Sequence, residues 1–89
     1  MKTIFLIINY NDYHTTEKLL NNIKNYNCID QIIVVDNNST DDSFSMLSKI
    51  SIDNLTVIKS KENKGYGAGI NFGCKYAQSK FGDCYIIVS

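Results

Sequence analysis

Several features that would place a chain in a familiar class are missing from this sequence. It has no proline, no internal repeat and no low-complexity linker, so nothing separates its 89 residues into two domains. Its nine basic and nine acidic side chains cancel, which argues against a nucleic-acid-binding module. The apolar run at residues 4–8 is too short for a membrane-spanning helix or a signal peptide. We therefore expect one cytoplasmic domain, residues 1–89, that binds no nucleic acid.

Cysteine and histidine are too few to build a metal site or a disulfide framework. The three cysteines, Cys28, Cys74 and Cys84, form no C-x-x-C pair and no zinc pattern with the single histidine. An odd number of thiols at unrelated spacings is typical of reduced cysteines in the cytosol. We expect no metal ligands among them.

The sequence does contain a regular alternation of strand and helix patterns. Apolar runs predict four strands, at residues 3–9, 31–35, 55–59 and 84–88. Helical spacing of apolar residues predicts helices at 14–26 and 67–79, with a short helix after residue 40. Such an alternation gives parallel pairing through crossover connections. We predict an α/β fold, a mostly parallel sheet of about four strands with helices on both faces, as in half of a Rossmann-like domain.

The same patterns predict details of the helices. Tyr26 continues the apolar face of the first helix, and Ile70, Cys74 and Ala77 lie at helical spacing on the last. Ser39 or Thr40 is expected to cap the short helix. Residues 41 and 42, both aspartates, would then lie in its first turn, where the helix dipole favours negative charge.

The second strand and the turn behind it are the most informative stretch. Residues 32–35 are an apolar, β-branched run that delivers Asp36 at the carboxyl end of a buried strand. Ligands bind at that end of the strands in open parallel sheets. Two interpretations of Asp36 remain open: it binds a ligand, or it only caps the following turn.

The common phosphate-binding motifs are absent. No glycine follows the first strand, where a G-x-G-x-x-G fingerprint would begin, and no Gly-Lys-Ser/Thr marks a P-loop. A receiver domain would have several acids after the first strand, where only Asp12 is found. The pattern therefore indicates a nucleotide-binding type of fold that lacks the usual phosphate-binding motifs.

Residues at the same edge of the sheet suit a base and a ribose instead. Tyr10 offers a ring to cover a planar base, and the backbone of Asn9 and Asn11 offers hydrogen bonds beside it. Asp36 accepts from an imide N–H or a ribose hydroxyl, and the loop that begins at Asn63 would close the other side. Each has a structural alternative: Tyr10 shields the sheet end, the asparagines form loops, and the glycines of residues 65–69 let a helix pack closely.

Three motifs, in order and at fitting spacing, resemble family-2 glycosyltransferases over nearly the whole chain. They are Asn9-Tyr10-Asn11, Val35-Asp36-Asn37-Asn38-Ser39-Thr40-Asp41 and Asn63-Lys64-Gly65-Tyr66-Gly67-Ala68-Gly69-Ile70-Asn71. The resemblance implies the GT-A fold, and within the family the motifs look most like rhamnosyl- and galactofuranosyl-transferases.

Site residues are implied by this resemblance, position by position. Asp36 would bind the pyrimidine of a UDP- or dTDP-sugar, and Tyr10 would flank the base together with Asn9 and Asn11. The loop beside the ribose and diphosphate would be shaped by Asn63, Gly65 and Asn71.

The resemblance also implies an inverting transferase that builds a cell-surface polysaccharide or glycolipid on a glycan or glycolipid acceptor, at the inner face of the membrane. The full-length enzyme would use Mg²⁺ or Mn²⁺, held by an Asp-x-Asp-like or Asn-Pro-Asp motif expected directly after residue 89. We therefore expect an N-terminal piece without catalytic residues, inactive alone, that self-associates through its last strand. The alternative is a non-catalytic nucleotide-binding or protein-interaction domain.

Overall fold

The computed structural model describes all 89 residues and contains one four-stranded parallel sheet. Its strands are β1 (Lys2–Asn9), β2 (Gln31–Asp36), β3 (Leu55–Lys59) and β4 (Cys84–Val88), in the order β3-β2-β1-β4. The central strands β1 and β2 are apolar runs because helices cover both of their faces. The predicted strands are confirmed to within one residue at each end.

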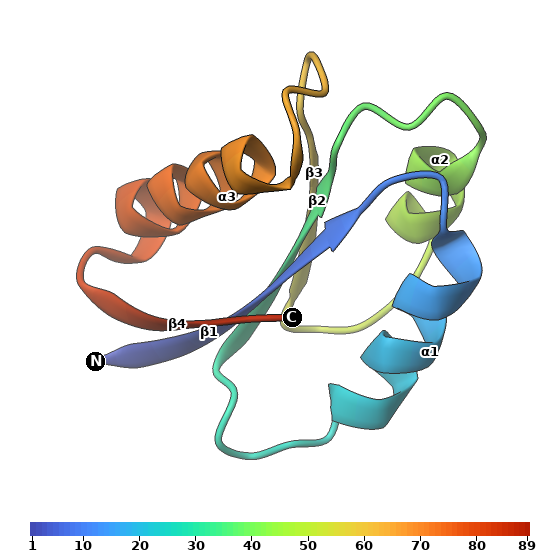
Figure 1. Cartoon of the computed structure of the whole chain (residues 1–89). Helices are drawn as coiled ribbons and strands as arrows, with labels where there is room; N and C mark the ends of the chain where they lie inside the picture. Colours follow the sequence, from blue (N-terminus) through green and yellow to red (C-terminus); the bar gives the residue numbers. More distant parts are fainter.

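Three helices connect the strands and cover both faces of the sheet (Figure 1). α1 (Tyr13–Ile23) and α2 (Ser43–Ser48) lie on one face, whereas α3 (Tyr66–Phe81) lies on the other, against β1 and β2. Because all the strand pairs are parallel, the carboxyl ends of the strands meet at one edge. The predicted α/β architecture is confirmed.

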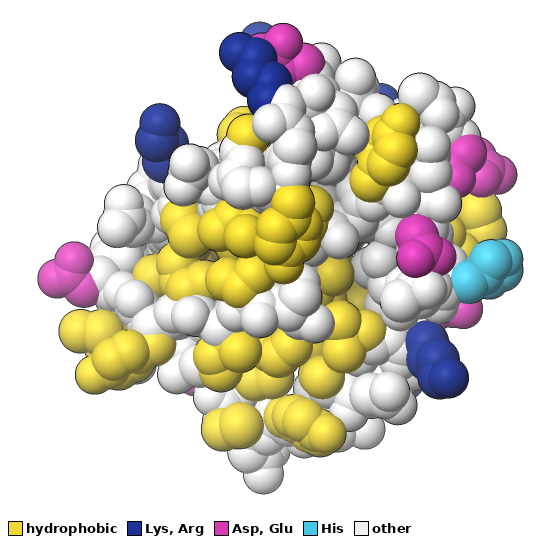
Figure 2. Space-filling view, in the orientation of Figure 1, with side chains coloured by type: hydrophobic (Ala, Val, Ile, Leu, Met, Phe, Trp, Pro, Cys, Tyr) yellow, Lys and Arg dark blue, Asp and Glu magenta, His cyan; other side chains and the backbone are white.

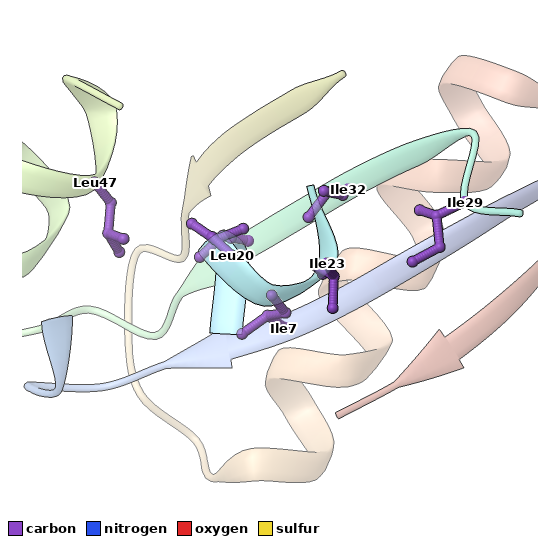
Figure 3. Close-up of a cluster of buried hydrophobic side chains, with 7 residues drawn as sticks. Ile7, Leu20, Ile23, Ile29, Ile32 and Leu47 are labelled. Atoms are coloured by element: carbon purple, nitrogen blue, oxygen red, sulfur yellow. The ribbon is translucent and has the colours of Figure 1, made fainter. Parts of the chain in front are cut away.

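The face beneath α1 and α2 holds the larger of two buried cores (Figure 3). Leu20 and Ile23 lie one turn apart on α1, so both side chains point toward the sheet. They meet Ile7 of β1 and Ile32 of β2 in one cluster. Burying each such side chain stabilises the fold by about 1.5–3 kcal/mol. This core fixes α1 beside the end of β1.

α3 meets the opposite face of the sheet through small residues. Its buried positions, Gly69, Gly73 and Ala77, follow one another at intervals of four residues and form a single stripe. A methyl group at Gly73 would lie 2.5 Å from Cδ1 of Leu6 and 3.0 Å from Cγ2 of Val35. The helix backbone therefore lies directly on β1 and β2, and the predicted Ile70 and Cys74 flank this stripe, partly buried.

Two expectations for the first helix are wrong: that it extends to residue 26, and that Tyr26 belongs to its apolar face. α1 ends at Ile23, and the N–H groups of Lys24 and Tyr26 donate to the carbonyls of Leu20 and Ile23 in the closing turns. The chain leaves the helix direction there, so Tyr26 does not continue the buried face and its side chain is 54% exposed.

No helix of the chain has the length and apolar character needed to cross a bilayer.

The predicted cap of the short helix is also wrong. α2 begins at Ser43, with Asp42 at its N-cap, so neither Ser39 nor Thr40 caps it and its first turn holds no acidic residue. The physical reason is a competing hydrogen bond: the hydroxyl of Ser39 donates to the carboxylate of Asp36 instead.

The three thiols differ in environment, and their reactivity should differ accordingly. Cys28 is exposed in the loop after α1, whereas Cys74 and Cys84 are partly buried beside α3. Burial raises the pKa of the Cys74 thiol, and the nearby Cys84 raises it further. Because the thiolate is the reactive form, we expect Cys28 to react with a disulfide reagent about tenfold faster than the other two. If one equivalent of the reagent's thiol is released quickly and two are released slowly, the prediction is confirmed. Three equal rates of release would contradict it.

Candidate functional site

A cleft of about 510 Å³ opens at the carboxyl ends of the strands. Its apolar wall includes Ile7 and Ile8 of β1 and Leu19 of α1. Two tyrosines line it and remain about half exposed: Tyr10, in the loop after β1, and Tyr66, at the start of α3. A mostly apolar hollow with aromatic rings and a few polar groups is the usual form of a small-molecule site.

A buried polar network lies beneath this cleft. Asp36 has no exposed surface, and its carboxylate accepts three hydrogen bonds: from Nδ2 of Asn9 (3.0 Å), from Oγ of Ser39 (2.6 Å) and from the backbone N–H of Ser39 (2.9 Å). The Oδ1 of Asn9 in turn accepts from the hydroxyl of Thr16 (2.7 Å). The network ties the ends of β1, β2 and the first turn of α1 into one unit.

Asn11 joins the loops that follow β1 and β2. Its Oδ1 accepts from the backbone N–H groups of Thr40 (2.8 Å) and Asp41 (3.2 Å), and its own backbone N–H donates to Oγ of Ser39 (2.9 Å). The residue has a φ of 50°, in the left-handed region that asparagine tolerates better than most residues. Its backbone N–H and its side chain are therefore engaged within the protein.

Asn37, which the sequence prediction did not select, is the polar side chain that turns from β2 into the cleft. Its Nδ2 donates to Oδ1 of Asn63 (3.2 Å) and to the carbonyl of Gly65 (3.1 Å). Because a backbone carbonyl only accepts, this contact fixes which end of the amide is nitrogen. The Oδ1 of Asn37 has no hydrogen-bond partner in the chain and is not fully buried, and Asn37 is one of the residues that line the cleft.

The loop between β3 and α3 is shaped by the same contacts. Asn63 Oδ1 also accepts from the backbone N–H of Gly65 (2.8 Å), and Gly65 has a φ of 99°, which favours glycine. This turn begins α3 and places Tyr66 at the rim of the cleft, where its hydroxyl donates to the carbonyl of Ser89 (3.2 Å). Tyr66 thereby links the start of α3 to the end of β4.

The family can be established at this point. A model of glycosyl transferase family 2 matches residues 4–89, which is nearly the whole chain. The chain belongs to this family. No curated protein matches it significantly.

A solved structure supports the fold of this family-2 chain. The chain is similar in structure to the mannosyltransferase PcManGT from Pyrobaculum calidifontis, which was solved in complex with GDP-Man and Mn²⁺. The TM-score is 0.75, and the identity is 24% over 85% of this chain. The match covers 24% of the length of that mannosyltransferase. The similarity confirms the Rossmann-like arrangement of the GT-A fold predicted from the sequence.

The predicted site residues of the family-2 chain fall into three groups. Tyr10, Asn63 and Gly65 line the cleft. The side chains of Asn9, Asn11 and Asp36 form the network beside it, so direct contact of Asp36 with a base stays a prediction. Asn71 lies on α3 and lines a separate, smaller hollow, together with Lys64 and Phe72.

The 89 residues contain no cluster of side chains that could hold a divalent cation. No three His, Cys, Asp or Glu side chains lie close enough to hold a metal ion. Mg²⁺ and Mn²⁺ need several oxygen ligands, and the one buried carboxylate, Asp36, already accepts its hydrogen bonds from the protein. These 89 residues therefore show no metal site of their own, and the metal that the sequence resemblance implies for a full-length enzyme stays a prediction.

Proposed function

We propose that the cleft binds the nucleoside diphosphate of a sugar donor, and that the base is the pyrimidine of UDP or dTDP. The observation that carries the proposal is the unpaired Oδ1 of Asn37, which faces a cleft lined by Tyr10 and Tyr66. Membership of glycosyl transferase family 2 supports a sugar nucleotide as the ligand. The mannosyltransferase with a similar fold was solved with GDP-Man, another sugar nucleotide.

Asn37 favours a base that presents a single N–H donor. The imide N–H of uracil or thymine is flanked by two carbonyls and matches one acceptor oxygen. Guanine presents two neighbouring donors, a pattern that a carboxylate with two acceptor oxygens matches better than an amide does. The Nδ2 of Asn37 is already engaged by Asn63 and Gly65, so Asn37 itself offers only its amide oxygen to a ligand.

The remaining parts of the proposal concern the whole enzyme. The chain would form the donor half of an inverting transferase of the rhamnosyl or galactofuranosyl type, at the inner face of the membrane. A hydroxyl of a glycan or glycolipid acceptor would attack the anomeric carbon and give its proton to a general base of the whole enzyme, while the bond from that carbon to the nucleoside diphosphate breaks. The product would be part of a cell-surface polysaccharide or glycolipid. In this scheme the chain's own residues hold the base of the donor, and the nucleoside diphosphate as a whole is the leaving group.

Binding can be tested by NMR titration of the ¹⁵N-labelled chain with UDP, dTDP, GDP and NADH in parallel. We expect UDP or dTDP to shift the amides of Tyr10, Asn37 and residues 63–66. Tyr10→Ala should weaken this binding about tenfold, because stacking of a base on an aromatic ring contributes about 1–3 kcal/mol. Tyr26→Ala is the matched control, since Tyr26 is exposed to a similar extent as Tyr10, 54% against 45%, and lies outside the cleft.

The possible outcomes separate the pyrimidine assignment from the rest of the proposal. Stronger binding of GDP than of UDP at the same amides would retain the site and reject the pyrimidine. A response to NADH alone would indicate a dinucleotide-binding domain. If none of the four nucleotides moves these amides, the proposed site is wrong for this chain.

A further inference from the structure

The cleft is lined by one charged side chain, that of Asp12, and this carboxylate has no partner in the chain. Asp12 is the N-cap of α1, where an aspartate normally accepts a hydrogen bond from a backbone N–H of the first turn. Its side chain makes no such bond, and the one ion pair of the chain joins Lys64 to Glu62 instead. Asp12 is exposed and lines the cleft. Capping therefore does not account for this side chain, and its oxygens are free to accept hydrogen bonds from a ligand.

A second free polar group, the hydroxyl of Thr15, lies beside Asp12. The two residues are three positions apart in the first turn of α1, a spacing that places side chains next to each other on a helix. Thr15 is exposed, lines the cleft and makes no hydrogen bond through its side chain. The hydroxyl of Thr16, by contrast, is buried and donates to Asn9. The start of α1 thus offers the cleft a carboxylate, which only accepts, and a hydroxyl, which donates or accepts.

These groups belong to the same cleft as the free amide oxygen of Asn37. Asn37 is only 4% exposed, yet its Oδ1 has no hydrogen-bond partner. Its backbone N–H donates to the carbonyl of Asn9 (2.8 Å), and Asp12 follows Asn9 by three residues, a length of at most about 11 Å. The two free acceptors of the cleft are therefore separated by a short segment of chain.

We propose that Asp12 binds the ribose of the nucleotide and makes the cleft selective for UDP over dTDP. The inference rests on the proposed function, in which Asn37 meets the pyrimidine of the same ligand. A ribose carries neighbouring 2′- and 3′-hydroxyl groups, and both donate well to a carboxylate. The 2′-deoxyribose of dTDP lacks the first of these hydroxyls. The hydroxyl of Thr15 is the second polar contact for this sugar.

The charge of Asp12 favours a sugar over a phosphate at this end of the cleft. A carboxylate repels a negatively charged diphosphate, whereas it accepts hydrogen bonds from hydroxyl groups. No lysine lines the cleft. On the face drawn in Figure 2, the lysine side chains lie at the margin, away from the hydrophobic area in the middle. The nucleoside therefore occupies the cleft, and its diphosphate extends away from Asp12.

Uridine and 2′-deoxyuridine test the ribose assignment, because they share one base and carry no phosphate. In NMR titrations followed at the amides of Tyr10 and Asn37, we expect uridine to bind at least about tenfold more tightly, the effect of one hydrogen bond to a charged group. Asp12→Ala should lower the affinity for uridine to that for 2′-deoxyuridine and leave the affinity for 2′-deoxyuridine unchanged. Asp12→Asn should also reduce the preference, since a neutral amide is a weaker acceptor, and it keeps the size of the side chain in case alanine disturbs the start of α1.

Asp42→Ala is the matched control for these variants. Asp42 is likewise an exposed N-cap aspartate without a side-chain cap bond, at the start of α2, and it lies outside the cleft. Its replacement should leave the preference for uridine unchanged.

The outcomes separate the ribose assignment from the proposed function. Equal binding of the two nucleosides at the amides of Tyr10 and Asn37 would retain the nucleotide site and overturn the role of Asp12. A preference for uridine that survives both Asp12 variants would overturn it as well. If neither nucleoside moves these amides, the inference is wrong, and the response to UDP shows whether the proposed function fails with it.

Discussion

Asp36→Ala is expected to lower the free energy of unfolding by about 3 kcal/mol, the cost of leaving buried hydrogen-bond donors without an acceptor. The carboxylate accepts from Asn9 once and from Ser39 twice, at a position with no exposed surface. Alanine would leave all three donors unpaired and remove the link between β1 and β2. For a domain of this size that is a large share of a total stability of about 5–15 kcal/mol. Urea denaturation monitored by circular dichroism measures the change.

Asp53→Ala is the control for this experiment, because Asp53 is exposed and makes no hydrogen bond through its side chain. We expect its effect to stay within about 0.5 kcal/mol. The same measurement separates the two roles considered for Asp36. If Asp36 serves chiefly to bind a base, its replacement would leave stability nearly unchanged and abolish nucleotide binding in a folded chain. That result would contradict the structural role described here.

Gly73→Ala is expected to destabilise the chain by about 2 kcal/mol, although alanine is the better helix former by about 1 kcal/mol. The added methyl would meet both Cδ atoms of Leu6, at 2.5 and 3.1 Å, and Cγ2 of Val35 at 3.0 Å. Both side chains are almost completely buried, so they have no open space into which to move. α3 would have to lift away from the sheet.

Gly67→Ala provides the matched comparison on the same helix. A methyl group there meets nothing within 4 Å, so the helix preference alone should stabilise the chain, by up to about 1 kcal/mol. In a Leu6→Ala background the methyl at Gly73 should cost little, because the side chain that it meets is gone. Thermal and urea unfolding of the four variants measure this coupling. Equal effects of alanine at the two glycines would show that α3 does not lie as close to β1 as described.

The elements of the fold could be predicted from the sequence because each strand is a continuous apolar run bounded by polar turn residues. The register of α3 could not be predicted in the same way. A search for apolar spacing selects Ile70 and Cys74, whereas the closest contact is made by Gly69 and Gly73, which have no side chain to give a signal. The predicted start of α2 is wrong for a similar reason, since the hydroxyl of Ser39 has several possible acceptors and only the fold decides among them.

In the candidate site, too, the sequence predicts where residues lie but not which way their side chains point. The sequence places Asp36 and Asn37 together at the carboxyl end of β2, but it does not show which side chain turns inward. Alternation along the strand gives the two residues opposite directions, so that Asp36 is buried under the loops and Asn37 faces the cleft. The neighbouring Asn63 and Gly65 then supply the acceptors that orient Asn37, a contact across 26 and 28 residues that no local pattern contains.

The contacts of Asn37 make ligand affinity and loop conformation thermodynamically linked. The amide oxygen is directed into the cleft only while the amide nitrogen is held by Asn63 and Gly65, that is, while the loop before α3 is in place. If that loop opened, the amide would rotate freely and would no longer present a fixed acceptor. A ligand that uses the oxygen therefore selects the closed population, and its apparent affinity falls in proportion to the fraction of open chains. A change in the loop far from the base, such as Asn63→Ala, would then act on binding as a population shift rather than as a lost contact.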